Sequence, residues 1–195
     1  EEFCKPLGLD SAKKIILYGA AGDFLFPAET TLVPLLSSVA QTVSANGAQV
    51  LFRPHPAFAS SVEGYRDLPG LRIDRSATRL APGRNGWSMT SEDELHLINS
   101  LHHCDVLVSA SGTSMLVDGA VFDKPLISVS FDGTKTTPYW FSIKRFFDHA
   151  DHGKALLAQN GTRIADSEKH LAAALEEAFV KPEALAKGRE RILDL

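Results

Sequence analysis

Short apolar runs alternate with helical patterns along most of the chain, and this alternation limits the fold more than any other feature. The apolar runs lie at 14–20, 48–53, 71–74, 104–109, 125–131 and 161–165. Helical spacing of apolar residues predicts helices over 29–45, 91–103, 112–122 and 168–180 and from Pro182 onward. Strands that alternate with helices through short connections form parallel sheets. The sequence therefore predicts an α/β fold, a Rossmann-like parallel sheet of about six strands with helices on both faces.

Three residues predict where helices begin. Ser91 is followed three residues later by Glu94, which is the pattern of a capping box. Ser167 stands directly before the predicted helix 168–180, and Pro182 suits the first turn of the last one.

The composition is that of a globular protein. Hydrophobic residues make up 44% of the 195 residues and charged residues 23%. No run approaches the roughly 18 apolar residues that a membrane-spanning helix needs. The net charge of −4 gives no reason to expect nucleic acid as a partner. The polar segment 1–14 lacks the pattern of a signal peptide, and we interpret it as a linker that enters a domain over 15–195.

Only two cysteines occur in the chain, and they are 100 residues apart. Cys4 lies near the start of the chain and Cys104 at the start of an apolar run. This usage is typical of free thiols in a reducing compartment, so we expect a cytoplasmic protein.

Polar residues follow the first two predicted strands. In parallel α/β sheets, ligands bind outside the carboxyl ends of the strands. Gly22 and Asp23 follow the first strand, where the glycine allows a tight turn and close approach to a ligand, although a turn alone would also explain it. The segment lacks the dinucleotide fingerprint G-x-G-x-x-G. After the second strand, Arg53 and His55 alternate with two prolines that hold the chain extended, which suits phosphate binding; the alternative is a solvated turn with a surface salt bridge.

The fourth strand leads into a polar loop. Ser111, Gly112, Thr113 and Ser114 offer backbone N–H groups and hydroxyls at a predicted helix start, which favours an anion. Asp118 follows nearly two turns later and is placed to accept hydrogen bonds from a ribose diol. The alternative is a capped core helix whose Asp118 faces solvent. A nucleophile elbow is disfavoured because G-x-S-x-G is absent.

Two histidine-rich segments raise the question of a metal. His102 and His103 are adjacent and diverge on a helix, whereas "DHADH" at 148–152 spaces its side chains by three. We favour a helix end for the first and a phosphate or acceptor contact for the second. We therefore expect neither a metal nor a cofactor.

Three segments in order resemble a known family. These are "LFRPHP" at 51–56, "CDVLVSASGTSMLVDGAVFDKPLISV" at 104–129 and the late segment 145–178. Together they resemble the C-terminal, donor-binding domain of GT-B glycosyltransferases, nearest the bacterial surface-polymer transferases of the CDP-glycerol glycerophosphotransferase type. The resemblance covers roughly residues 7 to 180.

The resemblance implies a function in cell-surface polysaccharide or teichoic-acid-type synthesis. It implies that Arg53, His55 and the loop 111–114 face the phosphates of a CDP- or UDP-linked donor, and that Asp118 binds the ribose. Gly22 and Asp23 would lie in the cleft facing an N-terminal half, which this chain does not contain. Peripheral membrane association, at the inner face, would come through that half. It assigns no catalytic residue here, so we expect the domain alone to be inactive. Two alternatives stay open, namely half of a nucleotide-sugar 2-epimerase and a non-catalytic binding module.

Overall fold

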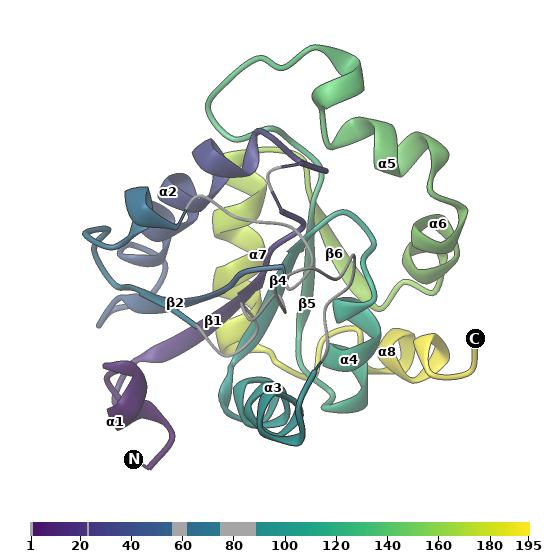
Figure 1. The fold of residues 1–195 in the computed structure, drawn as a ribbon. Coiled ribbons are helices and arrows are strands. Elements are labelled where there is room, and N and C mark those ends of the chain that lie inside the picture. Colours follow the sequence, from purple (N-terminus) through teal and green to yellow (C-terminus); the bar gives the residue numbers. More distant parts are fainter. Residues whose placement is uncertain (1, 23, 56–61, 75–88) are drawn as a thin grey trace.

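The structure is a computed structural model that describes residues 2–22, 24–55, 62–74 and 89–195 (Figure 1). Its centre is one six-stranded sheet in the order β3-β2-β1-β4-β5-β6, in which every neighbouring pair is parallel. The strands are β1 Lys14–Gly19, β2 Ala48–Arg53, β3 Leu71–Ile73, β4 Val106–Ala110, β5 Leu126–Val129 and β6 Thr162–Ala165. This confirms the predicted Rossmann-like sheet.

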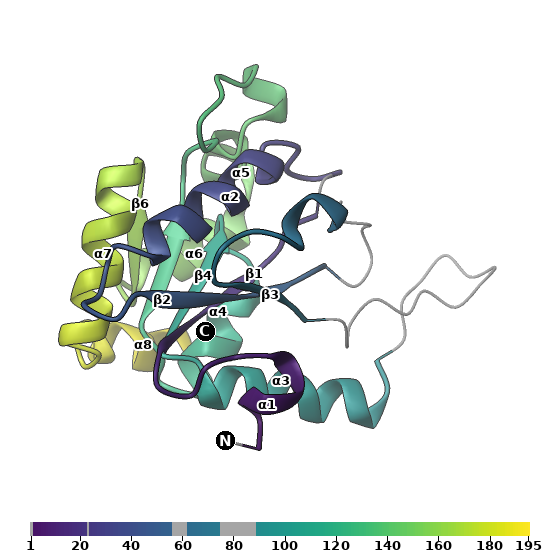
Figure 2. The same cartoon turned by 90° about the vertical axis from the view of Figure 1, so that its left-hand side faces the viewer.

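Helices cover both faces of the sheet (Figures 1 and 2). They are α1 Cys4–Leu7, α2 Glu29–Ala40, α3 Ser91–His103, α4 Met115–Val121, α5 Lys144–His149, α6 Asp151–Ala158, α7 Glu168–Val180 and α8 Ala186–Ile192, with single turns η1 Glu63–Tyr65 and η2 Tyr139–Phe141. Side chains alternate along β1, so Ile16 and Tyr18 pack beneath α2 and α7, whereas Ile15 and Leu17 pack towards α1, α3, α4 and α8. Burial on both faces explains why the four inner strands, β1, β2, β4 and β5, are mostly apolar in sequence.

The N-cap of helix α3 is Thr90, one residue before Ser91, which the sequence pattern indicates as the first residue of the capping box. The capping box is formed by Thr90 and Asp93, where Thr90 Oγ1 accepts from Asp93 N at 3.2 Å and Asp93 Oδ2 accepts from Thr90 N at 3.0 Å. The predicted pair of Ser91 and Glu94 is therefore wrong, because the overlapping T-x-x-D pattern is the one used. Ser167 is confirmed as the N-cap of α7, accepting from His170 N.

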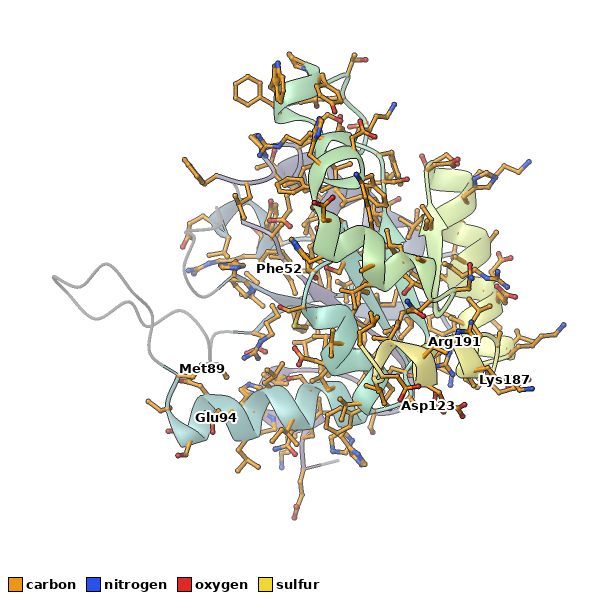
Figure 3. The ribbon with its side chains drawn as sticks, turned by 90° about the vertical axis from the view of Figure 1, so that its right-hand side faces the viewer. Phe52, Met89, Glu94, Asp123, Lys187 and Arg191 are labelled. Atoms are coloured by element: carbon orange, nitrogen blue, oxygen red, sulfur yellow. The ribbon has the colours of Figure 1, made fainter. Side chains whose placement is uncertain are left out.

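The last helix begins at Ala186 rather than at Pro182. Residues 182–185 instead wrap around the buried guanidinium of Arg189, which donates to the carbonyl oxygens of Pro182 and Ala184 and to Asp123. Figure 3 shows Asp123 beside α8, the helix that carries Lys187 and Arg191. A buried guanidinium needs hydrogen-bond acceptors, and here the carbonyl oxygens of residues 182 and 184 accept from it. In a regular helix these carbonyl oxygens would accept from backbone N–H groups one turn later.

Part of the segment 1–14 packs onto the face of the sheet that α3, α4 and α8 also cover. Helix α1 buries Cys4, and Phe3 stacks on His103 with ring centroids 4.7 Å apart. Both cysteines are buried as free thiols, and burial raises the pKa of Cys104 to about 12. Among the described residues, no helix combines the length and the apolar character needed to cross a bilayer.

Candidate functional site

A cavity of about 980 Å³ opens where the central strands end. Register places Gly19 of β1 level with Arg53 of β2 and with Ser109 of β4, so the carboxyl ends of these strands meet at one edge. The strand order reverses at β1, which is the topological switch point where open α/β sheets bind ligands. The walls are mostly apolar and come from the β1–α2 loop, the end of β2, the β4–α4 segment, α5 and α6, together with Met89, which Figure 3 shows at the start of α3 beside Glu94.

The cavity collects six of the nine residues that the sequence analysis selects. They are Arg53, His55, Ser111, Thr113, Ser114 and Asp118. Gly22 and Gly112 do not line it, and Asp23 lies outside the described residues. His152 of α6 is a further polar residue on its wall. Their binding roles stay predictions.

Glu29 organises the β1–α2 loop and was missed by the sequence analysis. Its side chain is fully buried, and Oε1 accepts from Tyr18 Oη at 2.8 Å and from Ala21 N at 2.9 Å. Its other oxygen, Oε2, accepts from Gly22 N at 3.0 Å. Burial and the adjacent carboxylate raise the pKa of Tyr18 well above its usual value. The N–H of Gly22 is therefore engaged by the protein itself. An acidic residue in the first turn after a glycine-containing loop is the signal that could have revealed this contact.

Arg53 is held by a buried carboxylate behind the cavity wall. Its Nη1 donates to Asp74 Oδ2 at 2.6 Å, and the other oxygen of Asp74 lies 3.2 Å from His96 Nε2. Asp74 is fully buried and Arg53 is 6% exposed. The alternative of a surface salt bridge is therefore wrong: the salt bridge exists, but β2, β3 and α3 enclose it. Asp74 fixes the guanidinium and neutralises much of its charge.

His55 lies at the cavity wall after β2, half-buried. Burial lowers its pKa, so the imidazole is neutral at pH 7. A neutral imidazole still has one N–H to donate to a ligand oxygen.

The β4–α4 loop differs in detail from the prediction. Helix α4 starts at Met115 instead of at position 112, and Ser114 makes no side-chain capping bond. Ser111 adopts a left-handed backbone, with φ of 64°, which is uncommon for a residue with a side chain. The hydroxyls of Ser109 and Thr113 are 2.7 Å apart. Hydroxyls of the loop thus stand at the end of a buried strand and line the cavity.

Asp118 lines the cavity and is half-buried, so its side chain lies at the candidate site, and its role there stays a prediction. Burial raises its pKa, and the nearby positive charge of Arg53 partly opposes that shift. The carboxylate is therefore incompletely solvated.

We expect Asp118→Asn to stabilise the folded chain at neutral pH. A carboxyl group whose pKa is raised on folding costs stability once it ionises, so stability falls as pH rises from the unfolded pKa through the folded one. The variant should melt about 2 °C above the wild type at pH 7. The difference should vanish below about pH 3, where both states are protonated. Thermal denaturation across this pH range measures it, and equal melting temperatures at pH 7 would contradict it.

In the second histidine-rich segment, His152 lines the cavity, so a phosphate or acceptor contact stays a prediction, whereas the side chains below have contacts outside it. Asp148 and His149 contact the hydroxyl of Tyr139, and His102 and His103 lie edge to face. Within the described ranges, no three side chains of His, Cys, Asp or Glu gather as metal ligands.

Comparisons with known proteins show the fold of GT-B glycosyltransferase halves. No family model matches the chain, and no curated protein is similar to it in sequence. Among solved structures, the C-terminal CMP-Kdo binding domain of WaaA from Acinetobacter baumannii aligns with all of this chain and 95% of its own, at 11% identity and a TM-score of 0.53. WaaG, a glycosyltransferase of lipopolysaccharide biosynthesis, aligns over 99% of this chain and 46% of its own, at 11% identity and a TM-score of 0.56.

The calicheamicin glycosyltransferase CalG4 aligns over 93% of this chain and 37% of its own, at 12% identity and a TM-score of 0.53. The ADP-heptose heptosyltransferase II of E. coli aligns over 93% and 51%, at 14% identity and a TM-score of 0.51. The chain thus spans about half or less of the length of WaaG, CalG4 and heptosyltransferase II. It spans nearly all of the isolated WaaA domain.

Proposed function

We propose that this chain is the donor-binding half of a GT-B transferase and holds a nucleoside-diphosphate donor in the cavity at the switch point. The observation that carries the proposal is the convergence, in one open cavity, of polar side chains from the ends of β2 and β4 and from α6. Convergence favours a ligand-binding domain over a binding module that has lost its ligand. The fold likeness to an isolated donor-binding domain supports the same assignment.

The residues divide between two parts of the donor. His55, Arg53 and the hydroxyls of Ser111, Thr113 and Ser114 bind the diphosphate. Because Asp74 already neutralises Arg53, hydroxyl and imidazole donors supply most of these contacts. Asp118 accepts from the ribose hydroxyls deeper along α4. The apolar walls are suited to the base and to the carbon skeleton of the transferred group.

The chemistry assigned to this half is binding and charge stabilisation. As the bond to the transferred group breaks, negative charge grows on the departing diphosphate, and the donors around it stabilise that charge. An N-terminal half would supply the acceptor site and complete the cleft. The larger neighbours, of which this chain spans about half or less, support that arrangement.

The transferred group is a sugar or glycerol phosphate delivered to a cell-surface polymer, and the donor nucleotide is cytidine-linked. The resemblance to CDP-glycerol glycerophosphotransferases supports this choice. The similar fold of the CMP-Kdo binding domain of WaaA agrees with a cytidine nucleotide.

Calorimetric titration of the chain with CDP, UDP and GDP tests the proposal. We expect CDP to bind best and His55→Ala to weaken its binding about tenfold, because a hydrogen bond to a charged oxygen contributes about 1.5 kcal/mol. His102→Ala is the matched control, since His102 is exposed at the far end of α3. If no nucleotide binds at millimolar concentration while the chain stays folded, the proposal fails; if UDP binds best, only the cytidine assignment fails.

A further inference from the structure

Three consecutive aromatic side chains project from the segment between β5 and α6. Tyr139, Trp140 and Phe141 form η2 and are 40%, 66% and 56% exposed. Figures 1 and 2 both show this part of the chain rising above the sheet and away from the rest of the domain. We call residues 133–147 the aromatic tip. Adjacent exposed aromatic rings on a protruding turn are costly in water, so they indicate a partner.

The base of the aromatic tip is firmly braced. Ile143 is fully buried, and its N–H donates to Asp132 Oδ1 at 2.8 Å, which closes the loop. Thr31 Oγ1 donates to Asp132 O at 3.0 Å and ties the base to α2. The base of the aromatic tip is therefore anchored to the domain.

Arg145 joins the aromatic tip to the β1–α2 loop. Its Nη1 donates to Trp140 O at 2.6 Å and its Nη2 to Leu25 O at 2.7 Å. The neighbour of Leu25, Phe24, is 78% exposed and adds a fourth ring on this side of the domain.

The charge of the aromatic tip is opposite to that of the whole chain. Residues 133–147 contain Lys135, Lys144 and Arg145 and no acidic residue, but Asp132 and Asp148 flank them, and Asp148 Oδ2 accepts from Tyr139 Oη at 2.7 Å. With both flanking aspartates counted, the tip still has one more cation than anions, whereas the chain carries a net charge of −4. The two lysines are exposed. Within the part of the chain that the structure describes, none of the three cations forms an ion pair. This combination suits an anionic partner.

We propose that the aromatic tip binds the surface of an anionic phospholipid bilayer. Tryptophan and tyrosine favour the headgroup region, where an apolar ring meets a polar edge. Lysine and arginine near the surface add attraction to anionic lipids. The tip is a convex projection, which a deformable bilayer surface accommodates readily. A protein partner would have to provide a matching pocket with acidic groups.

This surface adjoins the cavity. Phe146 belongs to the aromatic tip and also lines the cavity, so a bilayer at the tip lies beside the cavity rim. The proposal stands on the tip alone and does not depend on nucleotide binding. It places membrane contact on this half, whereas the sequence resemblance places it on an N-terminal half.

Vesicle binding tests the inference. Trp87→Phe leaves Trp140 as the only tryptophan. We expect its fluorescence to shift to the blue with vesicles of phosphatidylcholine and phosphatidylglycerol, and flotation to carry the chain with them. Replacing Lys135 and Lys144 by Gln should weaken partitioning about 25-fold, because each lysine near the surface contributes about 1 kcal/mol. Trp140→Ser should weaken it as well, whereas Val180→Ser, which alters an exposed apolar residue outside the tip, should not.

Three outcomes would overturn the inference. The first is an absence of binding to anionic vesicles by a folded chain, and the second is equal binding by the wild type and the lysine variant. The third is concentration-dependent self-association that Trp140→Ser abolishes, without vesicle binding; it would assign the tip to a contact between copies of the chain. Nucleotide titration of the same variants keeps this test separate from the proposed function, because neither the lysines nor Trp140 lines the cavity.

Discussion

Replacing Glu29 by Ala should lower the free energy of unfolding by about 3–5 kcal/mol, the range for removing one partner of a buried charged group. The change leaves the hydroxyl of Tyr18 and the N–H groups of Ala21 and Gly22 without the acceptor they now use, inside a fully buried site. Each stranded donor costs about 1–3 kcal/mol. Urea denaturation measures the loss, with Glu29→Gln as the matched variant, because it keeps the shape and one acceptor oxygen.

Tyr18→Phe separates the contributions to this site. It deletes only the hydroxyl, so it should cost less than Glu29→Ala, and the double variant should cost less than the sum of the two single ones. A loss below about 1 kcal/mol for Glu29→Ala would mean that water replaces the carboxylate and that the loop does not depend on it. Because Ala20 and Ala21 line the cavity, the same variants should also reduce nucleotide affinity.

The sheet could be predicted because its cause is local. The four inner strands are buried along nearly their whole length and are mostly apolar, since alternate residues such as Leu17 and Tyr18 are buried on opposite faces. The edge strands β3 and β6 are weaker, because each contains an exposed arginine. Helix boundaries were less predictable. Overlapping capping patterns at Thr90 and Ser91 compete, and only the tertiary position of Asp93 decides between them. The delayed start of α8 depends on a buried guanidinium that no local pattern announces.

The candidate site was partly predictable for a topological reason. Parallel strands bring their carboxyl ends to one edge, so residues after β2 and β4 had to be neighbours. What each side chain contacts depends on residues distant in sequence. Arg53 was expected at a ligand, yet Asp74 lies behind it, 21 residues away. His152 lines the cavity because α6 packs on the β4–α4 loop, and neither segment predicts the other.

That packing rests on two glycines whose backbones touch. A Cβ added at Gly112 would lie 2.6 Å from the Cα of Gly153 and 2.9 Å from its carbonyl oxygen. Both obstacles are backbone atoms, so the β4–α4 loop or α6 would have to move. A Cβ added at Gly153 would meet its nearest atom, the Gly112 carbonyl oxygen, at 3.2 Å, which a small adjustment relieves. The two positions therefore differ in tolerance although they share one contact.

We expect Gly112→Ala to lower stability by about 2–3 kcal/mol through overpacking and to weaken CDP binding by more than about tenfold. The affinity falls because Ser111, Thr113 and His152 lie on the two cavity walls that are pushed apart. Gly153→Ala should fold nearly as well as the wild type and lose clearly less affinity. Urea denaturation and calorimetric titration of both variants measure the contrast. If Gly112→Ala binds CDP as tightly as the wild type does, diphosphate binding does not depend on this loop. If both variants lose the same affinity, the loss comes from a displaced α6 and not from the loop.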